Sequence, residues 1–594
     1  MMMSFIAANM APIMFASLIV FLLFGYSVAF SLAACGLLFG LIGIELGLLP
    51  EALMQALPLR IFGIMQNDTL LAIPFFTFMG LILERSGMAE DLLDTIGQLF
   101  GPIRGGLGYA VVLVGAMLAA TTGVVAASVI SMGLISLPIM LRYGYDRRVA
   151  SGVIAASGTL AQIIPPSLVL IVLADQLGKS VGDLYKGAFI PGFCLTALYI
   201  GYVVVLSVIK PQFVPALPKD ARTIKEADGS AGLRSLLALA VISTCSALLF
   251  ARSRPATVAT DELIVTSMCV GIGVAFALSV LNRALHLRLL SQMAERVTFV
   301  LIPPLALIFL VLGTIFLGIA TPTEGGAMGA VGALAMAVGR RRLSLSLMRQ
   351  AMDTTMKLSS FVVLILVGST TFSLSFQAVD GAIWVEHLLT SLPGGQLGFL
   401  IVVNALIFFL AFFLDFFELA FIIVPLVGPV ASKLGVDLTW FGVLLAVNMQ
   451  TSFMHPPFGF ALFYLRSVAP VDDYDDRVTG KRLLKVTTGQ IYRGAIPFVL
   501  IQLIMVGVII AFPGLVTGNL GTTEQIDIDK AFREMRKDSR EGSSNPYLQA
   551  PAGAASGVPS SASPAASASG STEGEDPMQA LVESMQRSKA AQKP

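Results

Sequence analysis

The stretch GTLAQIIPPSLVLIVLAD, residues 158–175, decides the fold, because it places two adjacent prolines, Pro165 and Pro166, in a run apolar enough to cross a membrane. Proline lacks the N–H group that a helix needs and its ring clashes with the preceding turn, so the pair breaks a helix. In hydrocarbon such a break is tolerated only where it is buried in protein or lines a cavity. A second copy, QTSFMHPPFGFALFYLR from residue 450, carries Pro456 and Pro457 in the same setting. The two pairs therefore predict two broken helices packed inside the protein.

The composition is that of a polytopic all-helical membrane protein. Of the 594 residues, 56% are hydrophobic and 13% are charged, whereas a typical soluble domain carries about 25% charged residues. Apolar runs close to the roughly 20 residues needed to span a bilayer recur from residue 11 to residue 515, which predicts about ten to fourteen spans or half-spans. We interpret the first run as a retained span rather than a cleaved signal. The net charge of +1, with basic residues in the loops, gives no electrostatic case for nucleic-acid binding.

The composition also divides the chain into parts. Residues 516–594 contain a Pro/Ala/Ser/Gly-rich stretch that cannot bury a core, so we expect a disordered tail. A polar linker begins at Lys210, and two further apolar runs follow it. We expect a first half at 1–210, with a hairpin at about 115–140 and a broken helix at about 147–177. An insertion with two extra spans follows at 211–295. The second half at 296–515 has a hairpin at about 408–432 and a broken helix at about 438–468, and the tail occupies 516–594.

The two halves share a pattern at a fixed offset of 291 residues. Six identities recur without a gap, and most are proline or glycine, which set backbone geometry. They pair Pro138, Gly144, Asp146, Ala155, Pro165 and Pro166 with Pro429, Gly435, Asp437, Ala446, Pro456 and Pro457. Interrupted segments at corresponding positions of two repeats are the best sequence indication of a transporter's binding site.

Polar residues interrupt the apolar run before each proline pair, in AATTGVVAAS from residue 119 and FFLDFFELAF from residue 412. Each run predicts a re-entrant hairpin that turns near Thr121 to Ser128 or near Asp415 to Glu418. Free N–H groups at half-helix ends attract an anion, and free carbonyl groups coordinate a cation.

The segments just before the proline pairs supply mostly neutral oxygen-bearing side chains. Such oxygens suit a hard cation like Na⁺, although Ser and Thr hydroxyls also bond back to their own helix. The candidate ion- and substrate-binding residues are Thr121, Thr122, Gly123, Ser128, Ser157, Gly158, Thr159, Asp415, Glu418, Asn448, Gln450, Thr451 and Ser452.

Acids inside a membrane are candidates for function by default. Asp415 and Glu418 qualify, and so does Glu324 in ATPTEGG, which either faces a cavity or lies at the surface. The role of His455, beside the second proline pair, stays open. The sequence contains no phosphate-binding loop, no G-x-S-x-G and no H-E-x-x-H, so it predicts no enzyme and no cofactor. Without an ATP site, transport requires an ion gradient.

Several of these stretches together resemble one family. These stretches are GIATPTEGGAMGAVGAL from Gly318, which contains Thr321, Pro322, Thr323 and Glu324, GTLAQIIPPS from Gly158, LPIMLRYGYDRRVASGVIAASG from Leu137, and HPPFG from His455. Together they resemble the DctM-type large membrane subunit of tripartite ATP-independent periplasmic (TRAP) transporters. The similarity covers roughly residues 11–210 and 296–515.

The resemblance implies an ion-transporter-superfamily elevator fold with two inverted repeats, located in the bacterial inner membrane. It implies Na⁺-coupled uptake of a small carboxylate, such as a C4-dicarboxylate or a 2-oxo acid. The implied partners are a periplasmic solute-binding protein of the DctP type and a small four-helix membrane subunit of the DctQ type. In such families the hairpin tips and the facing unwound segments hold Na⁺ and substrate, which corresponds here to residues 121–128, 157–159, 415–418 and 448–452.

Two departures and two alternatives accompany the resemblance. The first tip reads TTGVVAAS where the family usually has a Ser-rich tip, so we expect one ion site to use other ligands or more carbonyl groups. Residues 211–295 are an insertion relative to the usual family pattern. A stand-alone Na⁺- or H⁺-coupled elevator carrier for carboxylates, without a binding protein, is the alternative function, and a membrane scaffold without transport is a third. The basic connections at Arg340–Arg342 and at Lys481, Arg482 and Lys485 predict that both lie on the cytoplasmic side.

Overall fold

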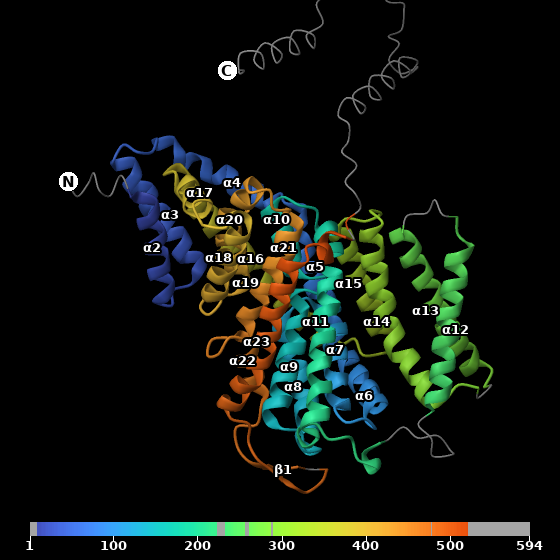
Figure 1. The fold of residues 1–594 in the computed structure, drawn as a ribbon. Helices are drawn as coiled ribbons and strands as arrows, with labels where there is room; N and C mark the ends of the chain where they lie inside the picture. The colour runs from blue at the N-terminus through green and yellow to red at the C-terminus, as the bar shows by residue number, and fades with distance from the viewer. Residues whose placement is uncertain are drawn as a thin grey trace, which may run out of the picture. The chain divides into compact units, whose positions relative to one another are not determined.

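The chain is helical throughout, apart from one short antiparallel ribbon, in the residues that the structure describes. The structure is a computed structural model that describes residues 9–222, 232–255, 260–286, 289–476, 478–518 and 520. Within these residues, eight helices are long and apolar enough to cross a membrane, and up to eleven spans result if each of three bent helix pairs counts as one. The prediction of an all-helical polytopic membrane protein is confirmed (Figure 1).

The first proline pair separates two helices, as its sequence predicts. Helix α9 (Arg147–Thr159) continues into a 3₁₀ turn, η3 (Leu160–Gln162), and α10 (Leu168–Leu177) begins after the prolines with Ser167 as its N-cap. A hairpin precedes α9 and consists of α7 (Gly106–Thr122) and α8 (Val125–Arg142).

The second half has the same order of elements. Helix α18 (Gly395–Leu410) leads into α19 (Phe416–Ile422) and α20 (Val424–Lys433), which are bent by 53° at Ile423. Helix α21 (Leu438–Met449) then continues into η6 (Gln450–Phe453), and α22 (Phe460–Val468) follows the second proline pair.

The duplicated residues have duplicated structural roles. Gly144 and Gly435 both adopt left-handed backbone conformations, with φ of 85° and 75°, at the end of their hairpins. Two residues later, Asp146 and Asp437 cap α9 and α21: the backbone N–H of Arg148 donates to Asp146 at 2.9 Å, and that of Trp440 donates to Asp437 at 2.7 Å. The identities at the 291-residue offset therefore mark where each broken helix begins and ends.

The remaining elements surround these two units. They are α2 (Met10–Leu23), α3 (Val28–Glu45), η1 (Glu51–Ala56), α4 (Leu57–Met65), η2 (Asp68–Leu71), α5 (Ala72–Arg85), α6 (Met88–Phe100), α11 (Val181–Ile209), η4 (Pro211–Phe213), η5 (Lys219–Ala221), α14 (Gln292–Phe316), α15 (Pro322–Gly339), α16 (Leu345–Ala378), α17 (Gly381–Thr390), β1 (Tyr474–Asp475), β2 (Arg482–Leu483), α23 (Thr488–Ala511) and α24 (Gly514–Thr517). The two halves pack on each other in a crossed manner, with α9 against α23 and α21 against α11.

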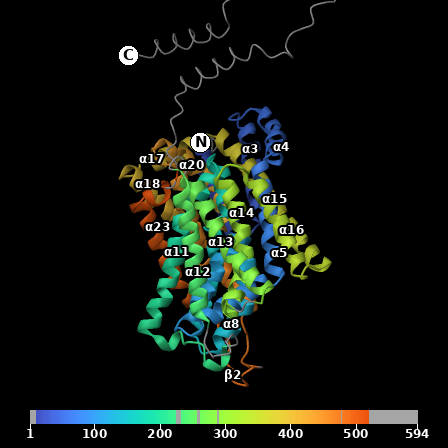
Figure 2. The same ribbon diagram turned by 90° about the vertical axis from the view of Figure 1, so that its right-hand side faces the viewer.

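Residues 211–295, the predicted insertion, contain two apolar helices. Helices α12 (Leu233–Ser253) and α13 (Thr260–Ala284) lie side by side, at the right-hand edge in Figure 1 and facing the viewer in Figure 2. The Ser243 hydroxyl of α12 donates to the Gly271 carbonyl of α13 at 2.7 Å. Only 6% of the apolar window of α12 is buried, so most of its surface is available to lipid.

The start of the predicted polar linker is packed rather than free. Val214 and Leu217 are buried, and their backbones pair with Gly105 and Gly101 next to α7. The predicted tail lies outside the described residues, except for 516–518 and 520; of these, residues 516 and 517 end α24.

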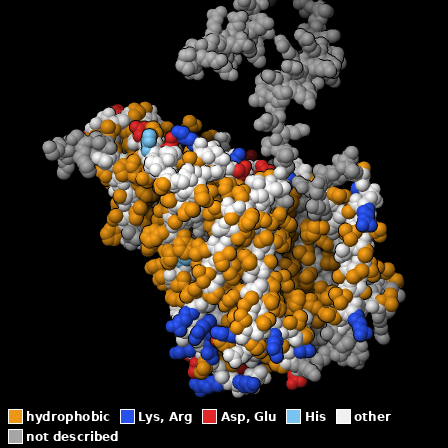
Figure 3. All heavy atoms as spheres, in the orientation of Figure 1, with side chains coloured by type: hydrophobic (Ala, Val, Ile, Leu, Met, Phe, Trp, Pro, Cys, Tyr) orange, Lys and Arg blue, Asp and Glu red, His pale blue; other side chains and the backbone are white. Residues whose placement is uncertain are grey.

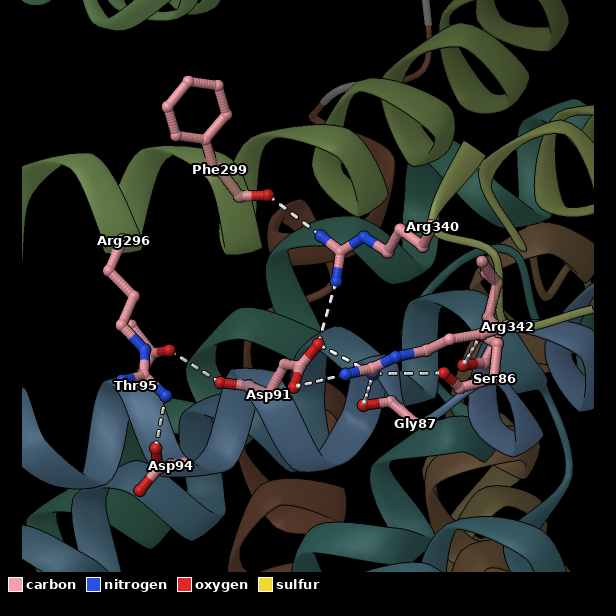
Figure 4. A network of polar contacts seen from close by, with 10 residues as sticks. Ser86, Gly87, Asp91, Asp94, Thr95, Arg296, Phe299, Arg340 and Arg342 are labelled. Carbon is pink, nitrogen blue, oxygen red and sulfur yellow. Dashed lines mark hydrogen bonds and ion pairs between the residues drawn. The ribbon is translucent and has the colours of Figure 1, made fainter. Parts of the chain in front are cut away.

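Charge is concentrated at one end of the described chain. Figure 3 shows apolar side chains over its flanks and Lys and Arg side chains gathered at its lower end, where Figure 1 places β1. Figure 4 shows how the basic connection after α15 is held: Arg340 and Arg342 both bind Asp91 of α6, at 3.0 and 2.9 Å. Arg296 of α14 binds Asp94 at 2.6 Å. Helix α6 is thereby linked to α14 and α15.

Candidate functional site

Both hairpin tips and both helix breaks line one cavity of about 550 Å³. The first tip contributes residues 123–126 and the second tip contributes residues 413–418. Gln162 and Leu168 flank the first proline pair, and Phe453 and Phe460 flank the second. The other lining residues are Leu22, Gly25, Tyr26, Ser27, Val28, Leu358, Phe361 and Tyr464. Segments far apart in the sequence therefore converge here, as the duplicated breaks predict.

The first tip offers backbone N–H groups. Gly123 ends α7 with φ of 58°, and Val124 is extended, which reverses the chain within two residues. Helix α8 has no side-chain N-cap bond and no acid in its first turn. Because the first N–H groups of a helix have no partner within it, this end of α8 is suited to an anion. The structure describes no side-chain position for Thr121 or Thr122, and Ser128 is buried one turn into α8.

The second tip carries two carboxylates in a capping box. The N–H of Glu418 donates to Asp415 Oδ1 at 2.9 Å, and the N–H of Asp415 donates to Glu418 Oε2 at 2.9 Å. This reciprocal arrangement satisfies orphan donors at the start of α19 and places negative charge at the positive end of the helix. Val124 and Asp415 are equivalent at the 291-residue offset, so the tips differ in charge at corresponding positions.

The predicted residues before the first break lie beside the cavity lining rather than in it. The Ser157 hydroxyl donates to the Val153 carbonyl at 2.6 Å, so it is satisfied by its own helix. A Cβ on Gly158 would overlap Val129 of α8, so this glycine permits the close approach of α9 to the first hairpin. Thr159 donates to the Ala156 carbonyl at 2.8 Å.

One hydrogen bond joins the two breaks. Gln450 Nε2 donates to Thr159 Oγ1 at 3.0 Å, and both residues are fully buried. Their numbers differ by 291, so they occupy equivalent positions in the two halves. The contact therefore shows that the two breaks meet in the interior of the protein.

The second break carries oxygens that lack partners. Asn448 donates through Nδ2 to the carbonyl and to Oδ1 of Asn404, at 2.8 and 2.9 Å, and Thr451 donates to the Asn448 carbonyl at 2.7 Å. In the described part of the chain, several buried side-chain oxygens near the breaks have no hydrogen-bond partner, namely Gln162 Oε1, Asn448 Oδ1, Gln450 Oε1 and Ser452 Oγ. Unpaired buried acceptors are costly, so each requires a ligand, an ion or water.

His455 is enclosed by aromatic rings. Its ring stacks on Phe412 at 4.2 Å between centroids and meets the edge of Phe408 at 4.4 Å, with 1% of the residue exposed. It packs the second break against the end of α18, next to the second tip.

The ATPTEGG motif forms a helix start outside the cavity. Thr321 and Glu324 make a capping box at the first turn of α15, with Pro322 at the first helical position. The Thr323 hydroxyl donates to the Asp68 carbonyl at 2.7 Å and connects α15 to η2. Glu324 is exposed, so of the two alternatives left open by the sequence, the structure has the surface position.

Four polar residues of this region were missed by sequence reasoning. Gln162 lines the cavity, and Asn404 holds Asn448. Gln502 donates to the Tyr199 hydroxyl at 2.9 Å in the buried contact between α23 and α11. Gln162 was detectable, because it lies within the quoted stretch and is a lone amide in an apolar run.

The fold is that of an all-helical, multi-pass membrane protein with a cavity between its broken helices. The family model for the tripartite ATP-independent periplasmic transporter DctM component matches residues 15–515. The chain belongs to this family: it is a multi-pass TRAP transporter permease and not an enzyme. The resemblance in the sequence is thus confirmed.

Individual relatives are distant. The C4-dicarboxylate TRAP transporter large permease protein DctM of Pseudomonas aeruginosa is 28% identical over 467 residues, which cover 78% of this chain and 88% of that protein. The sialic acid TRAP transporter permease protein SiaT of Haemophilus influenzae is 22% identical, covering 75% of this chain and 59% of that protein. Among solved structures, the YdaH transporter of Alcanivorax borkumensis matches with a TM-score of 0.43 and 14% identity, covering 78% of this chain and 89% of that one.

Proposed function

We propose that this permease takes up a small organic acid together with Na⁺, through the cavity between its two hairpin tips. The observation that carries the proposal is the convergence of both tips and both breaks on one cavity, beside buried oxygens that have no partner in the described chain. The relatives named above are described as permeases for C4-dicarboxylates and for sialic acid, both of them acids.

The unpaired oxygens support Na⁺ as the coupling ion. Amide oxygens only accept hydrogen bonds, so Asn448 Oδ1 and Gln450 Oε1 need a donor or a cation. Hard cations prefer such oxygen ligands, and neutral ligands hold Na⁺ without a permanent buried charge. Because a hydrogen bond joins Thr159 of the first break to Gln450 of the second, an ion bound at one break would influence the side chains at the other break.

The first tip supports binding of a carboxylate. The uncapped start of α8 lines the cavity and carries no acid in its first turn. N–H groups and the positive end of the helix dipole together favour an anion at this point.

We further propose that the two halves are inverted repeats whose hairpins and broken helices move together past the remaining helices, as in an elevator. The duplicated caps, turns and breaks support this repeat. The implied setting is the bacterial inner membrane, with a DctQ-type small subunit and a DctP-type periplasmic binding protein.

Uptake into proteoliposomes tests the proposal. The permease is co-reconstituted with the small subunit, and radiolabelled carboxylates are added with purified binding protein and an inward Na⁺ gradient. Uptake that requires both Na⁺ and the binding protein is expected. Uptake without the binding protein would favour the stand-alone carrier, and retention of uptake after mutation of both breaks would contradict the assigned site.

A further inference from the structure

The charge of the cavity differs from that expected for a site that binds only an acid. Two carboxylates line it, Asp415 and Glu418, and no Lys, Arg or His is among its described lining residues. Each carboxylate uses one oxygen in the capping box, which leaves the other oxygen of each group outside that pair of bonds. A dicarboxylate here would meet like charges at close range in a site of low dielectric constant.

Aromatic rings form a large part of the rest of the wall. They come mainly from the second break, the second tip and the loop before α3, and include Tyr26, Phe413, Phe416, Phe460 and Tyr464. Three of them present large exposed areas, with Tyr26 at 65%, Phe413 at 48% and Phe460 at 40%. Aromatic faces next to carboxylates attract organic cations, because the ring quadrupole is negative on its face.

Gln162 is a second and independent feature of the site. It lines the cavity, is 2% exposed, and its Oε1 has no hydrogen-bond partner in the described chain. An amide oxygen can only accept. The unsatisfied group therefore calls for a positively charged or N–H-bearing ligand, the same kind of group that the carboxylates favour.

The two tips favour ligand groups of opposite charge at equivalent positions. The first tip presents free N–H groups with no acid, and the second tip presents two acids that offset its own helix dipole. A ligand that spans the cavity would thus place its anionic end at residues 123–126 and its cationic end at residues 415–418.

We propose that the solute is a zwitterion: a small carboxylate that also carries a quaternary ammonium, guanidinium or amidinium group. This inference rests on the proposed function and narrows its substrate class. Asp415 and Glu418 are specificity-determining residues in this account, and Na⁺ binds in addition to the cationic group rather than in its place.

The test is ligand-dependent thermal stabilisation of the purified permease with its small subunit, at saturating NaCl. The probes are glycine betaine, a guanidinium carboxylate and a cyclic amidinium carboxylate, compared with succinate and pyruvate. The wild type is expected to respond to at least one cation-bearing probe at lower concentration than to either simple acid. A stronger response to succinate or pyruvate, or no response to any cation-bearing probe, would overturn the inference.

The double variant Asp415→Asn with Glu418→Gln removes the charges and keeps the cap. Asn is a good N-cap residue, and the chain already uses Gln in this role, since Gln490 Oε1 accepts from the Thr487 N–H at 3.0 Å. The half-saturating concentration of the responding probe is expected to rise about tenfold or more, the scale expected when a desolvated charge pair is lost. The matched control is Glu324→Gln, the same change in the same motif outside the cavity.

Failure of this inference is distinguishable from failure of the proposed function. Na⁺-dependent uptake of succinate or pyruvate alone, with no cation-bearing solute transported, would retain the function and overturn the zwitterion. Absence of Na⁺-dependent uptake for every probe would overturn both. An unchanged probe response in the double variant would show that the two carboxylates do not select the solute.

Discussion

Replacement of Gly152 by alanine tests the packing that holds the first broken helix in place. Gly152 on α9 faces Gly494 on α23, and the two backbones touch directly. A Cβ on Gly152 would lie 2.7 Å from the carbonyl carbon of Gly494 and closer still to its oxygen, whereas ordinary contact begins near 3.4 Å. The helices must therefore separate by at least about 0.7 Å, since a backbone carbonyl cannot rotate away as a side chain can.

The expected cost follows from that overlap. Overpacking of a well-packed interior costs about 1–3 kcal/mol, and the rigid backbone on both sides places Gly152→Ala at the upper end of that range. Gly494→Ala strains the same helix–helix contact from the α23 side, because its Cβ would lie 3.0 Å from the Gly152 nitrogen. Because both changes strain one contact, the double variant is expected to cost less than the sum of the two.

The assay is thermal unfolding of the detergent-purified protein, followed by tryptophan fluorescence. Trp440 is a suitable reporter because it is buried and its indole N–H donates to the Ile509 carbonyl of α23 at 3.0 Å. Variants are compared at one scan rate, because large membrane proteins unfold irreversibly. The control is Gly507→Ala, also on α23, where no atom lies within 4 Å of the new Cβ.

The control is expected to melt at or above the wild-type temperature, because alanine favours a helix over glycine by about 1 kcal/mol. Gly152→Ala and Gly494→Ala are expected to melt lower. If Gly152→Ala matched the wild type, or if Gly507→Ala were equally destabilised, the reasoning from backbone contact would be wrong.

Three further predictions concern polar contacts. Thr159→Val, which removes the acceptor of Gln450, should raise the Na⁺ concentration for half-maximal uptake, whereas Thr159→Ser should not; equal effects would exclude a role for the hydroxyl. Burial raises the pKa of Asp476, but hydrogen bonds from Thr479 and from Arg142 outweigh it and hold the pKa below its ordinary value of 3.8. The stabilisation by Asp476 is therefore present above pH 3.8 and is lost as the pH falls through the lower pKa of the folded protein. Asp476→Asn should lower the melting temperature at pH 7, and the melting temperatures of variant and wild type should converge in strong acid. A difference in melting temperature that stays constant with pH would contradict this. Asp91→Asn should cost about 1 kcal/mol or less in the same melting assay, because its arginine partners are partly exposed, and a larger loss would indicate that α6 depends on this ion-pair network.

The sequence predicted the helix breaks well, because the residues that set them act locally. The prolines at 165–166 and at 456–457 each separate two helices, and Asp146 and Asp437 cap the helices that follow their hairpins. Gly123 also acts locally. It lets the chain reverse at the first tip, because its φ of 58° is strained for residues other than glycine.

Which side chains face the cavity could not be predicted in the same way. Every residue from 149 to 174 is buried, so α9 has no polar face that would reveal its orientation. Ser157 and Gly158 were consequently predicted as site residues and Gln162 was not, yet of these three only Gln162 lines the cavity. The 3₁₀ turn after Thr159 changes the direction of the side chains in a way that no periodicity records.

The position of Glu324 was open in the sequence for a different reason. In the structure the T-P-T-E stretch forms a capping box with proline at the first helical position. Asp415 and Glu418 have the same spacing, so the motif identifies a helix start but does not say whether it lies at a cavity. That distinction depends on tertiary packing.

A cryo-electron microscopy structure of the permease with its small subunit, in lipid nanodiscs with Na⁺ and the transported solute, tests the central claim most directly. The account predicts density for the solute between residues 123–126 and residues 415–418, with Gln162 in contact. Ordered solute bound elsewhere, with this cavity empty and both hairpins unchanged, would contradict it.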